Sequence, residues 1–190
     1  MIETLAEGVY VRRGFLPPRA LLEVLAALDR LGPAWASSRE MRLLGRGQTS
    51  QVRPTDLVAR GPLDEVRRTL APAVLRSARD CGFRFPAPPT LQLFPVRMLG
   101  DAEHPAYQEP HTDSRGPEAA TPLCSSVFYA RVRGVSGGAL SVAAKPGGDL
   151  SNAVELPPSA NTLVTFPGDR VHAVRPLRAG ERISVVINLY

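Results

Sequence analysis

The chain has 190 residues, of which 44% are hydrophobic and 22% are charged, and its formal net charge is +5. This length and composition suit one core, so we expect residues 1–190 to form a single domain. The positive charges are almost all arginines, scattered along a chain with 6% aromatic residues, which argues against nucleic-acid binding. No apolar run approaches the ~18 residues of a membrane span, and no signal peptide is recognisable. We therefore expect a cytoplasmic protein.

Two helices are predicted near the N-terminus, after a strand within Gly8–Leu16. Leucines at three-to-four spacing predict an amphipathic helix from Pro18 to Leu31. A second helix is predicted from Leu63 to Cys81, and Pro72 should kink or divide it. Between the helices, residues 33–62 have no sustained period and carry several arginines. A loop of this length in a small domain is usually functional or disordered, so this segment is the candidate for a lid over the active site.

From residue 86 onward, short apolar or alternating runs are separated by Gly and Pro. Such a pattern predicts a sandwich, jelly roll or barrel. The predicted strands are Thr90–Met98, Leu123–Val132, Ala139–Ala144, Ala153–Leu156, Thr162–Phe166, Val171–Val174 and Arg182–Leu189. We thus expect residues 1–85 to hold a strand, the helices and the lid, and residues 86–190 to hold the β core.

A candidate metal site begins with His111 and Asp113 in the segment PHTDS. On an extended segment, residues two apart project to the same side, so both side chains can reach one ion. His172, in the later apolar segment RVHAV, is the candidate third ligand. Two nitrogens and one carboxylate form the facial triad of non-haem iron(II) sites. Taken alone, PHTDS is more often an ordinary turn, and His104 in its polar loop is interpreted as a surface residue.

Arg182 and Ser184 follow in the segment RISVV. On a strand they share a face, where they offer a bidentate cation and a hydroxyl donor to a buried carboxylate. Alternatively, Arg182 could be an ordinary surface charge on an edge strand. Because this segment is the most apolar of the C-terminus, an unpaired charge there would be costly.

The order of these pieces resembles the 2-oxoglutarate/iron(II)-dependent dioxygenase superfamily, in particular its small prolyl-4-hydroxylase-like members. The resemblance rests on H-x-D, Gly137-Gly138 before a strand, a strand and turn leading to His172, and Arg182 ten residues later. It spans Leu91–Tyr190. It implies a mainly β fold, the double-stranded β-helix or jelly roll, with the N-terminal helices packed on one sheet. It also implies Fe(II), 2-oxoglutarate as co-substrate and O2, with ascorbate helpful in vitro.

The resemblance implies a role for each matching residue. His111, Asp113 and His172 would bind iron, and Arg182 would pair with the distal carboxylate of 2-oxoglutarate. The family often has a tyrosine on the strand before H-x-D, whereas this chain has LQLFPVRML there. Candidates for the helper of the arginine are therefore Ser184, Tyr107, Gln92 and Arg97. Halogenating relatives lack the aspartate, so Asp113 favours hydroxylation.

Four polar residues are candidates for substrate binding: Arg115, Tyr129, Arg131 and Asn188. Their arginines favour a small anionic metabolite, such as an amino acid or a natural-product acid. Tyr129 could equally be core packing, and Arg131 could lie on a solvated strand face. The competing functions are a hydroxylase of prolyl or other residues in a protein, and a cupin-like metal-binding module without turnover. Desaturation, epoxidation or ring formation at the same centre stays open.

Overall fold

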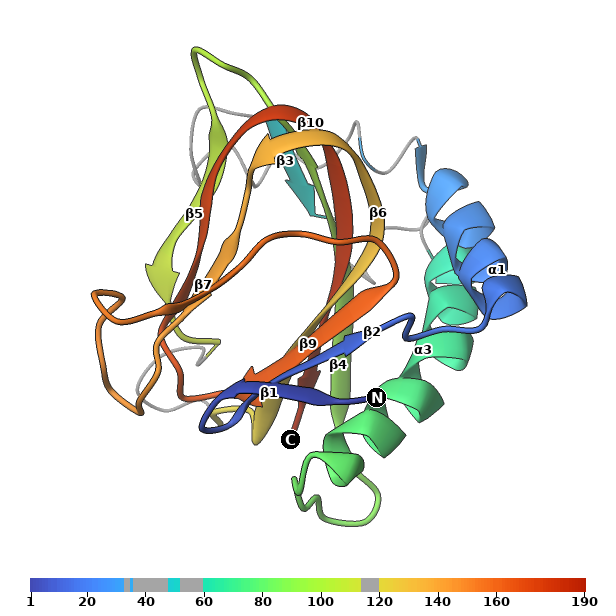
Figure 1. Ribbon diagram of the computed structural model, residues 1–190. Helices are drawn as coiled ribbons and strands as arrows, with labels where there is room; N and C mark the ends of the chain where they lie inside the picture. Colours follow the sequence, from blue (N-terminus) through green and yellow to red (C-terminus); the bar gives the residue numbers. More distant parts are fainter. Residues whose placement is uncertain (33–34, 36–47, 52–59, 114–119) are drawn as a thin grey trace.

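The computed structural model describes residues 1–32, 35, 48–51, 60–113 and 120–190. Over these residues the chain forms a curled β-structure with two long helices on one side (Figure 1). The helices are α1 (Pro18–Asp29) and α3 (Arg60–Asp80). The strands are β1 (Glu3–Ala6), β2 (Val9–Arg13), β3 (Gln48–Gln51), β4 (Leu91–Leu99), β5 (Ala106–His111), β6 (Cys124–Gly137), β7 (Leu140–Val142), β8 (Val154–Leu156), β9 (Thr162–Pro167) and β10 (His172–Leu189). The mainly β, jelly-roll prediction is confirmed.

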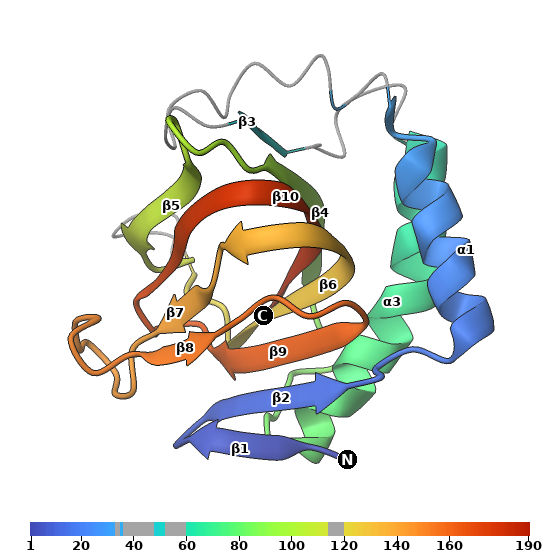
Figure 2. The same cartoon turned by 45° about the horizontal axis from the view of Figure 1, so that its top comes forward.

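The strands pair in the order β1-β2-β9-β6-β10-β4-β3, while β5 and β7 pair with β10, and β8 pairs with β7. Strand β10 therefore joins two groups of strands: the main path from β1 to β3, and the group formed by β5, β7 and β8. Its first residues pair with β5 and β7, and its C-terminal part lies between β6 and β4. The sheet therefore curls into a nearly closed barrel (Figure 2). Predicting two separate strands, Val171–Val174 and Arg182–Leu189, was wrong because β10 runs unbroken through a series of register shifts.

Gly180 lies where β10 passes from one group of strands to the other. Its φ is +81°, and a Cβ built there would lie 2.3 Å from the carbonyl oxygen of Arg133. A side chain would be strained at this φ and would collide with β6. The glycine therefore allows β10 to follow β6 closely, and the same strand can carry both His172 and Arg182.

Helices α1 and α3 cover the outer face of the sheet formed by β9, β6, β10 and β4 (Figure 1). The periodic apolar residues of both helices pack there against alternate strand residues, among them Phe128, Val185 and Ile187. Helix α3 runs through the exposed Pro72 without a break, so of the two expected effects of Pro72, a kink or a division, the division was wrong. The prediction of helices packed on one sheet is confirmed.

Strand β3 lies within residues 33–62, the predicted lid, and pairs with the edge strand β4. The prediction of an irregular loop was wrong for these four residues, whose segment QTSQ has no apolar alternation to indicate a strand. The rest of the predicted lid lies outside the described residues, apart from Trp35 and the start of α3. Within the described residues, no helix is long and apolar enough to span a bilayer.

Candidate metal centre and adjoining cavity

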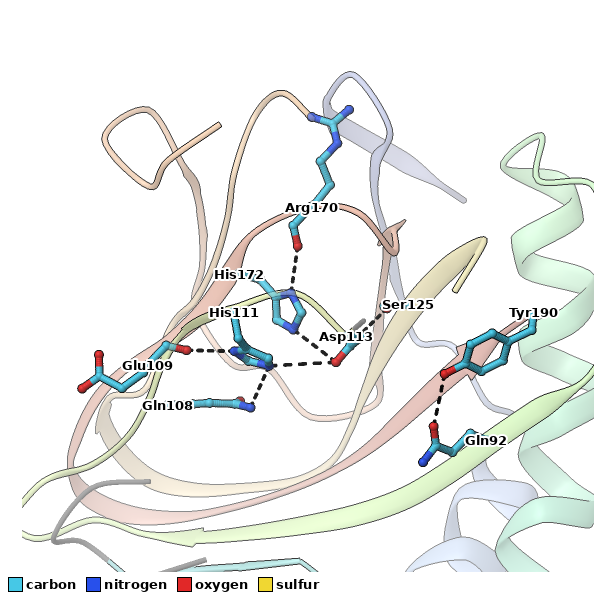
Figure 3. A network of polar contacts seen from close by, with 9 residues as sticks. All are labelled: Gln92, Gln108, Glu109, His111, Asp113, Ser125, Arg170, His172 and Tyr190. Carbon is cyan, nitrogen blue, oxygen red and sulfur yellow. Dashed lines mark hydrogen bonds and ion pairs between the residues drawn. The ribbon is translucent and has the colours of Figure 1, made fainter. Parts of the chain in front are cut away.

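Three side chains with metal-binding atoms meet at one end of the barrel. His111 ends β5 and pairs in register with His172, the first residue of β10, while Asp113 lies two residues beyond β5. The Oδ1 atom of Asp113 is 3.7 Å from Nε2 of His172 and 3.9 Å from Nε2 of His111. Ligand atoms of the three residues all lie within 4.8 Å of one another, which is close enough for one ion (Figure 3).

Backbone carbonyls orient both imidazole rings. Nδ1 of His111 is 2.8 Å from the carbonyl oxygen of Glu109, and Nδ1 of His172 is 3.1 Å from that of Arg170. A carbonyl oxygen only accepts, so Nδ1 of each ring carries a proton, and in the neutral ring the lone pair is on Nε2. Both lone pairs therefore belong to the nitrogens nearest Asp113 (Figure 3).

His172 is buried, with its ring centroid 4.3 Å from that of His111 and 5.0 Å from that of Phe166. Burial lowers the pKa of His172, because water no longer solvates the charged ring. The neighbouring His111 also lowers this pKa, while Asp113 raises it. The net direction favours the neutral ring, which is the form that binds metals.

Asp113 is held from the side opposite the histidines. The hydroxyl of Ser125 on β6 donates to its Oδ2 atom at 2.5 Å, and Oδ1 is left toward the two rings. Sequence reasoning missed Ser125. Two consecutive serines open β6, and only the strand pairing shows that Ser125 approaches Asp113 whereas Ser126 contacts Thr165 at 3.0 Å. The three candidate ligands are thus oriented by protein groups behind them.

A cavity of about 120 Å³ adjoins the triad inside the barrel. Its walls come mainly from β4, β5, β6, β7 and β10. The lining residues are Phe94, Val96, Met98, Gln108, His111, Asp113, Val127, Leu140, His172, Val174, Arg182, Ser184 and Val186. The cavity is therefore apolar except at the triad, at Gln108 and at the pair Arg182 and Ser184.

Arg182 is 3% exposed, and its Nη1 donates to the carbonyl oxygen of Gly138 at 2.9 Å. Its guanidinium carbon lies 5.1 Å from the ring centroid of Tyr129, a cation–π contact. Burial lowers the pKa of Arg182 and raises that of Tyr129, and each group partly offsets the shift of the other. Among the described residues, no carboxylate forms an ion pair with this guanidinium.

Three buried polar atoms at the arginine end of the cavity have no hydrogen-bond partner within the described chain: Arg182 Nε, Ser184 Oγ and Tyr129 Oη. Such atoms are rare in proteins, since each costs on the order of 1–3 kcal/mol. The side chains of Ser184 and Arg182 line the cavity, and Tyr129 contacts the guanidinium. This end of the cavity can accept a carboxylate, which would pair with the cation and accept from the hydroxyls.

The other candidates for the helper role lie away from the cavity. Gln92 accepts a hydrogen bond from the Tyr190 hydroxyl at 3.3 Å, well apart from the triad (Figure 3). Arg97 pairs with Glu181 at 2.8 Å, on the face of β4 opposite Val96 and Met98. Tyr107 is half-buried and does not line the cavity.

A β-bulge separates the two candidate substrate residues on β6. Ser184 pairs with Tyr129 and Ile183 pairs with Arg131, so Ala130 has no partner on β10. Because of this extra residue, the side chains of β6 after Ala130 point to the opposite face from the one that regular alternation would give them. Tyr129 consequently stays on the cavity face, while Arg131 faces the helices and pairs with Asp29 of α1 at 2.8 Å. The structure does not bring Arg131 to the cavity.

The remaining predicted residues are placed as follows. Asn188 is buried on the same strand face as Ser184 and pairs in register with Ser125. Arg115 lies outside the described residues. His104 is exposed, as expected. Cys124, for which no role is predicted, is also buried, and burial raises its pKa to about 12, which disfavours the reactive thiolate.

A cluster of two histidines and one aspartate in a jelly roll, beside a buried arginine, is typical of non-haem iron(II) oxygenases. In agreement with this, residues 97–190 match the family model of the 2OG-Fe(II) oxygenase superfamily. A search of curated protein sequences finds no match.

Similar solved structures include a Pseudomonas putida prolyl-4-hydroxylase (17% identity, TM-score 0.66, covering 96% of this chain and 91% of that chain). A Trichoplax adhaerens prolyl hydroxylase in complex with a hypoxia inducible factor peptide is also similar (15% identity, TM-score 0.66, covering 96% of this chain and 83% of that chain). A third is the α-ketoglutarate-dependent epimerase SnoN from nogalamycin biosynthesis (19% identity, TM-score 0.68, covering 96% of this chain and 77% of that chain). The matched part of the chain, residues 97–190, belongs to the 2OG-Fe(II) oxygenase superfamily. The protein is a dioxygenase of that superfamily, whose members use Fe(II) and 2-oxoglutarate.

Proposed function

We propose that the protein hydroxylates a small molecule, with His111, Asp113 and His172 as iron ligands and Arg182 and Ser184 as the binding site for 2-oxoglutarate. One observation carries the proposal. Two imidazole lone pairs and a carboxylate oxygen lie within 4.8 Å of one another, beside a buried guanidinium that has no described carboxylate partner. A metal fits the first group and a dicarboxylic acid fits the second.

The donor set agrees with Fe(II). Two neutral imidazoles and one carboxylate leave three positions of an octahedron for other ligands, as in non-haem iron oxygenases. Bound iron would supply the reaction of 2-oxoglutarate and O2 with a C–H bond. In that reaction one oxygen atom enters succinate, the other enters the new hydroxyl group, and the C1 carboxylate leaves as CO2.

The protein groups supply position and charge. Arg182 would form a bidentate ion pair with the distal carboxylate, and Ser184 would donate its hydroxyl proton to the same group. The buried Tyr129 hydroxyl, which lacks a partner within the described chain, is assigned here to the co-substrate end, not to the substrate. The apolar walls, such as Val127, Leu140 and Val186, exclude water from the reacting groups.

The size and lining of the cavity support a small substrate. Its walls are side chains of the barrel interior, and its volume of about 120 Å³ has to take the co-substrate and the reacting part of the substrate. SnoN, one of the similar structures, takes part in the biosynthesis of a small molecule. Two other similar structures are prolyl hydroxylases, so a peptidyl substrate is the second candidate.

The test is succinate formation from 2-oxoglutarate under Fe(II) and ascorbate. The panel contains small metabolites and proline-containing peptides. We expect small molecules to raise succinate release above the unstimulated rate. We expect Arg182→Ala to abolish the release of succinate from 2-oxoglutarate. Stimulation by peptides alone would favour the second candidate. A non-catalytic metal-binding module would release no succinate, and Arg182→Ala would have no effect.

A further inference from the structure

Gln108 lies on β5, three residues before His111, and lines the cavity. Its amide nitrogen is 2.9 Å from Nε2 of His111 (Figure 3). Nδ1 of the same ring donates to the Glu109 carbonyl oxygen at 2.8 Å, so in the neutral ring Nε2 is the acceptor and the amide nitrogen of Gln108 is the donor. The amide therefore occupies the lone pair that His111 would offer to a metal.

One lone pair serves one partner. A metal at Nε2 of His111 displaces the Gln108 amide, because the nitrogen cannot accept a proton donor and coordinate an ion together. The displaced side chain remains anchored on β5 at the edge of the triad. Its amide N–H groups and carbonyl oxygen are then free to face whatever lies next to the metal.

The other polar groups of the cavity already have tasks in the proposed function. The triad would hold the metal, while Arg182 and Ser184 would hold 2-oxoglutarate. Among the described lining residues, Gln108 is the polar side chain that remains, and the others are apolar.

We propose that Gln108, released from His111 by the metal, is the residue that recognises the substrate. It does so through an uncharged group that donates and accepts hydrogen bonds, such as an amide or a hydroxyl. This inference rests on the proposed function.

The charges of the described lining favour an uncharged group over the anion that the sequence led us to expect. The amide of Gln108 has a donor and an acceptor and no net charge. Arg131, one of the arginines behind the anionic expectation, pairs with Asp29 outside the cavity. Within the described lining, Arg182 is the one arginine, and the co-substrate would occupy it.

The first experiment measures Mn(II) binding by anaerobic titration calorimetry for the wild type, Gln108→Leu and Gln92→Leu. Removing the competing amide should tighten Mn(II) binding of Gln108→Leu by about three- to tenfold, the value of one hydrogen bond. Gln92→Leu is the matched control, because this amide contacts Tyr190 away from the cavity, and should bind like the wild type. Unchanged or weaker binding by Gln108→Leu would overturn the proposal.

The second experiment measures succinate release with a panel of amides, alcohols, carboxylates and amines. We expect wild-type release to be stimulated by compounds with an uncharged amide or hydroxyl. For these compounds Gln108→Leu should raise KM at least about tenfold, whereas Gln92→Leu should not. Stimulation by charged compounds alone, stimulation by none of the uncharged compounds, or an unchanged KM in Gln108→Leu would overturn the assignment.

The two proposals can fail separately. If metal-loaded wild-type protein binds no 2-oxoglutarate, the proposed function fails, yet the Mn(II) comparison of the two glutamine variants remains readable. If 2-oxoglutarate binds and is converted while the glutamine variants behave alike, the inference on Gln108 alone fails.

Discussion

The two ends of the cavity differ in how the protein satisfies their polar atoms. At the triad, each candidate ligand has a protein partner behind it: the Glu109 carbonyl, the Arg170 carbonyl or the Ser125 hydroxyl. At the other end, polar atoms of Arg182 and Ser184 are buried without a partner in the described chain.

This difference indicates two kinds of binding. The triad is preorganised, because its rings and carboxylate are fixed before a cation arrives. The arginine end is incomplete, because its buried donors without acceptors destabilise the folded protein until a ligand supplies acceptors. A metal should therefore bind without the co-substrate, and a diacid should complete hydrogen bonds that the protein leaves open.

The largest expected effect is at the triad. His172→Ala should abolish measurable Mn(II) binding, a loss of more than about a hundredfold, since removing one of three ligands leaves too few donors. The exposed His104 is the matched control, and His104→Ala should bind Mn(II) like the wild type. Calorimetric titration measures both. Retained binding in His172→Ala would contradict the assignment of the triad.

At the arginine end, Arg182→Met keeps much of the side-chain volume and removes the charge. We expect affinity for 2-oxoglutarate in the Mn(II)-loaded protein to fall roughly a hundredfold, because one charged partner of a buried pair is lost. Mn(II) affinity should not change. A parallel loss of metal binding would show that the two ends do not act separately.

The hydroxyl behind Asp113 should have an intermediate effect. Ser125→Ala should weaken Mn(II) binding by about tenfold, which is typical when a group that orients a ligand is removed. Ser125→Thr, which keeps the hydroxyl, should restore much of the affinity. Ser126→Ala changes the neighbouring serine, whose hydroxyl contacts Thr165, and should leave metal binding unchanged. Equal effects of the two alanine variants would contradict a positioning role for Ser125.

The smallest effect is expected for Tyr129→Phe. The lost hydroxyl has no partner in the described chain, so the melting temperature without ligands should not fall. Affinity for 2-oxoglutarate should fall about fivefold if this hydroxyl donates to the distal carboxylate. Thermal unfolding with and without 2-oxoglutarate measures both quantities. A destabilised unliganded protein with unchanged affinity would assign Tyr129 to core packing.

The sequence predicted the parts of the molecule that follow simple periods. The leucines of α1 repeat along one helix face, and His111 and Asp113 lie two apart at the end of a strand. Arg182 and Ser184 share one face of β10 for the same reason, and both line the cavity. Such patterns are local, so they can be read without knowing which strands become neighbours.

Contacts between distant strands could not be predicted in this way. The bulge at Ala130 turns Arg131 toward α1, and nothing in the segment FYARVR indicates the extra residue. Ser125 and Gln108 approach the triad only because of how β5, β6 and β10 fold against one another. The continuity of β10 likewise depends on Gly180, which the sequence analysis did not interpret.

The most direct test of the account is a crystal structure of the protein prepared without oxygen and with Mn(II) and 2-oxoglutarate. We predict one metal ion bound by Nε2 of His111, the carboxylate of Asp113 and Nε2 of His172, with the distal carboxylate of 2-oxoglutarate on Arg182. A metal enclosed by four protein ligands, or a co-substrate carboxylate away from Arg182, would contradict it.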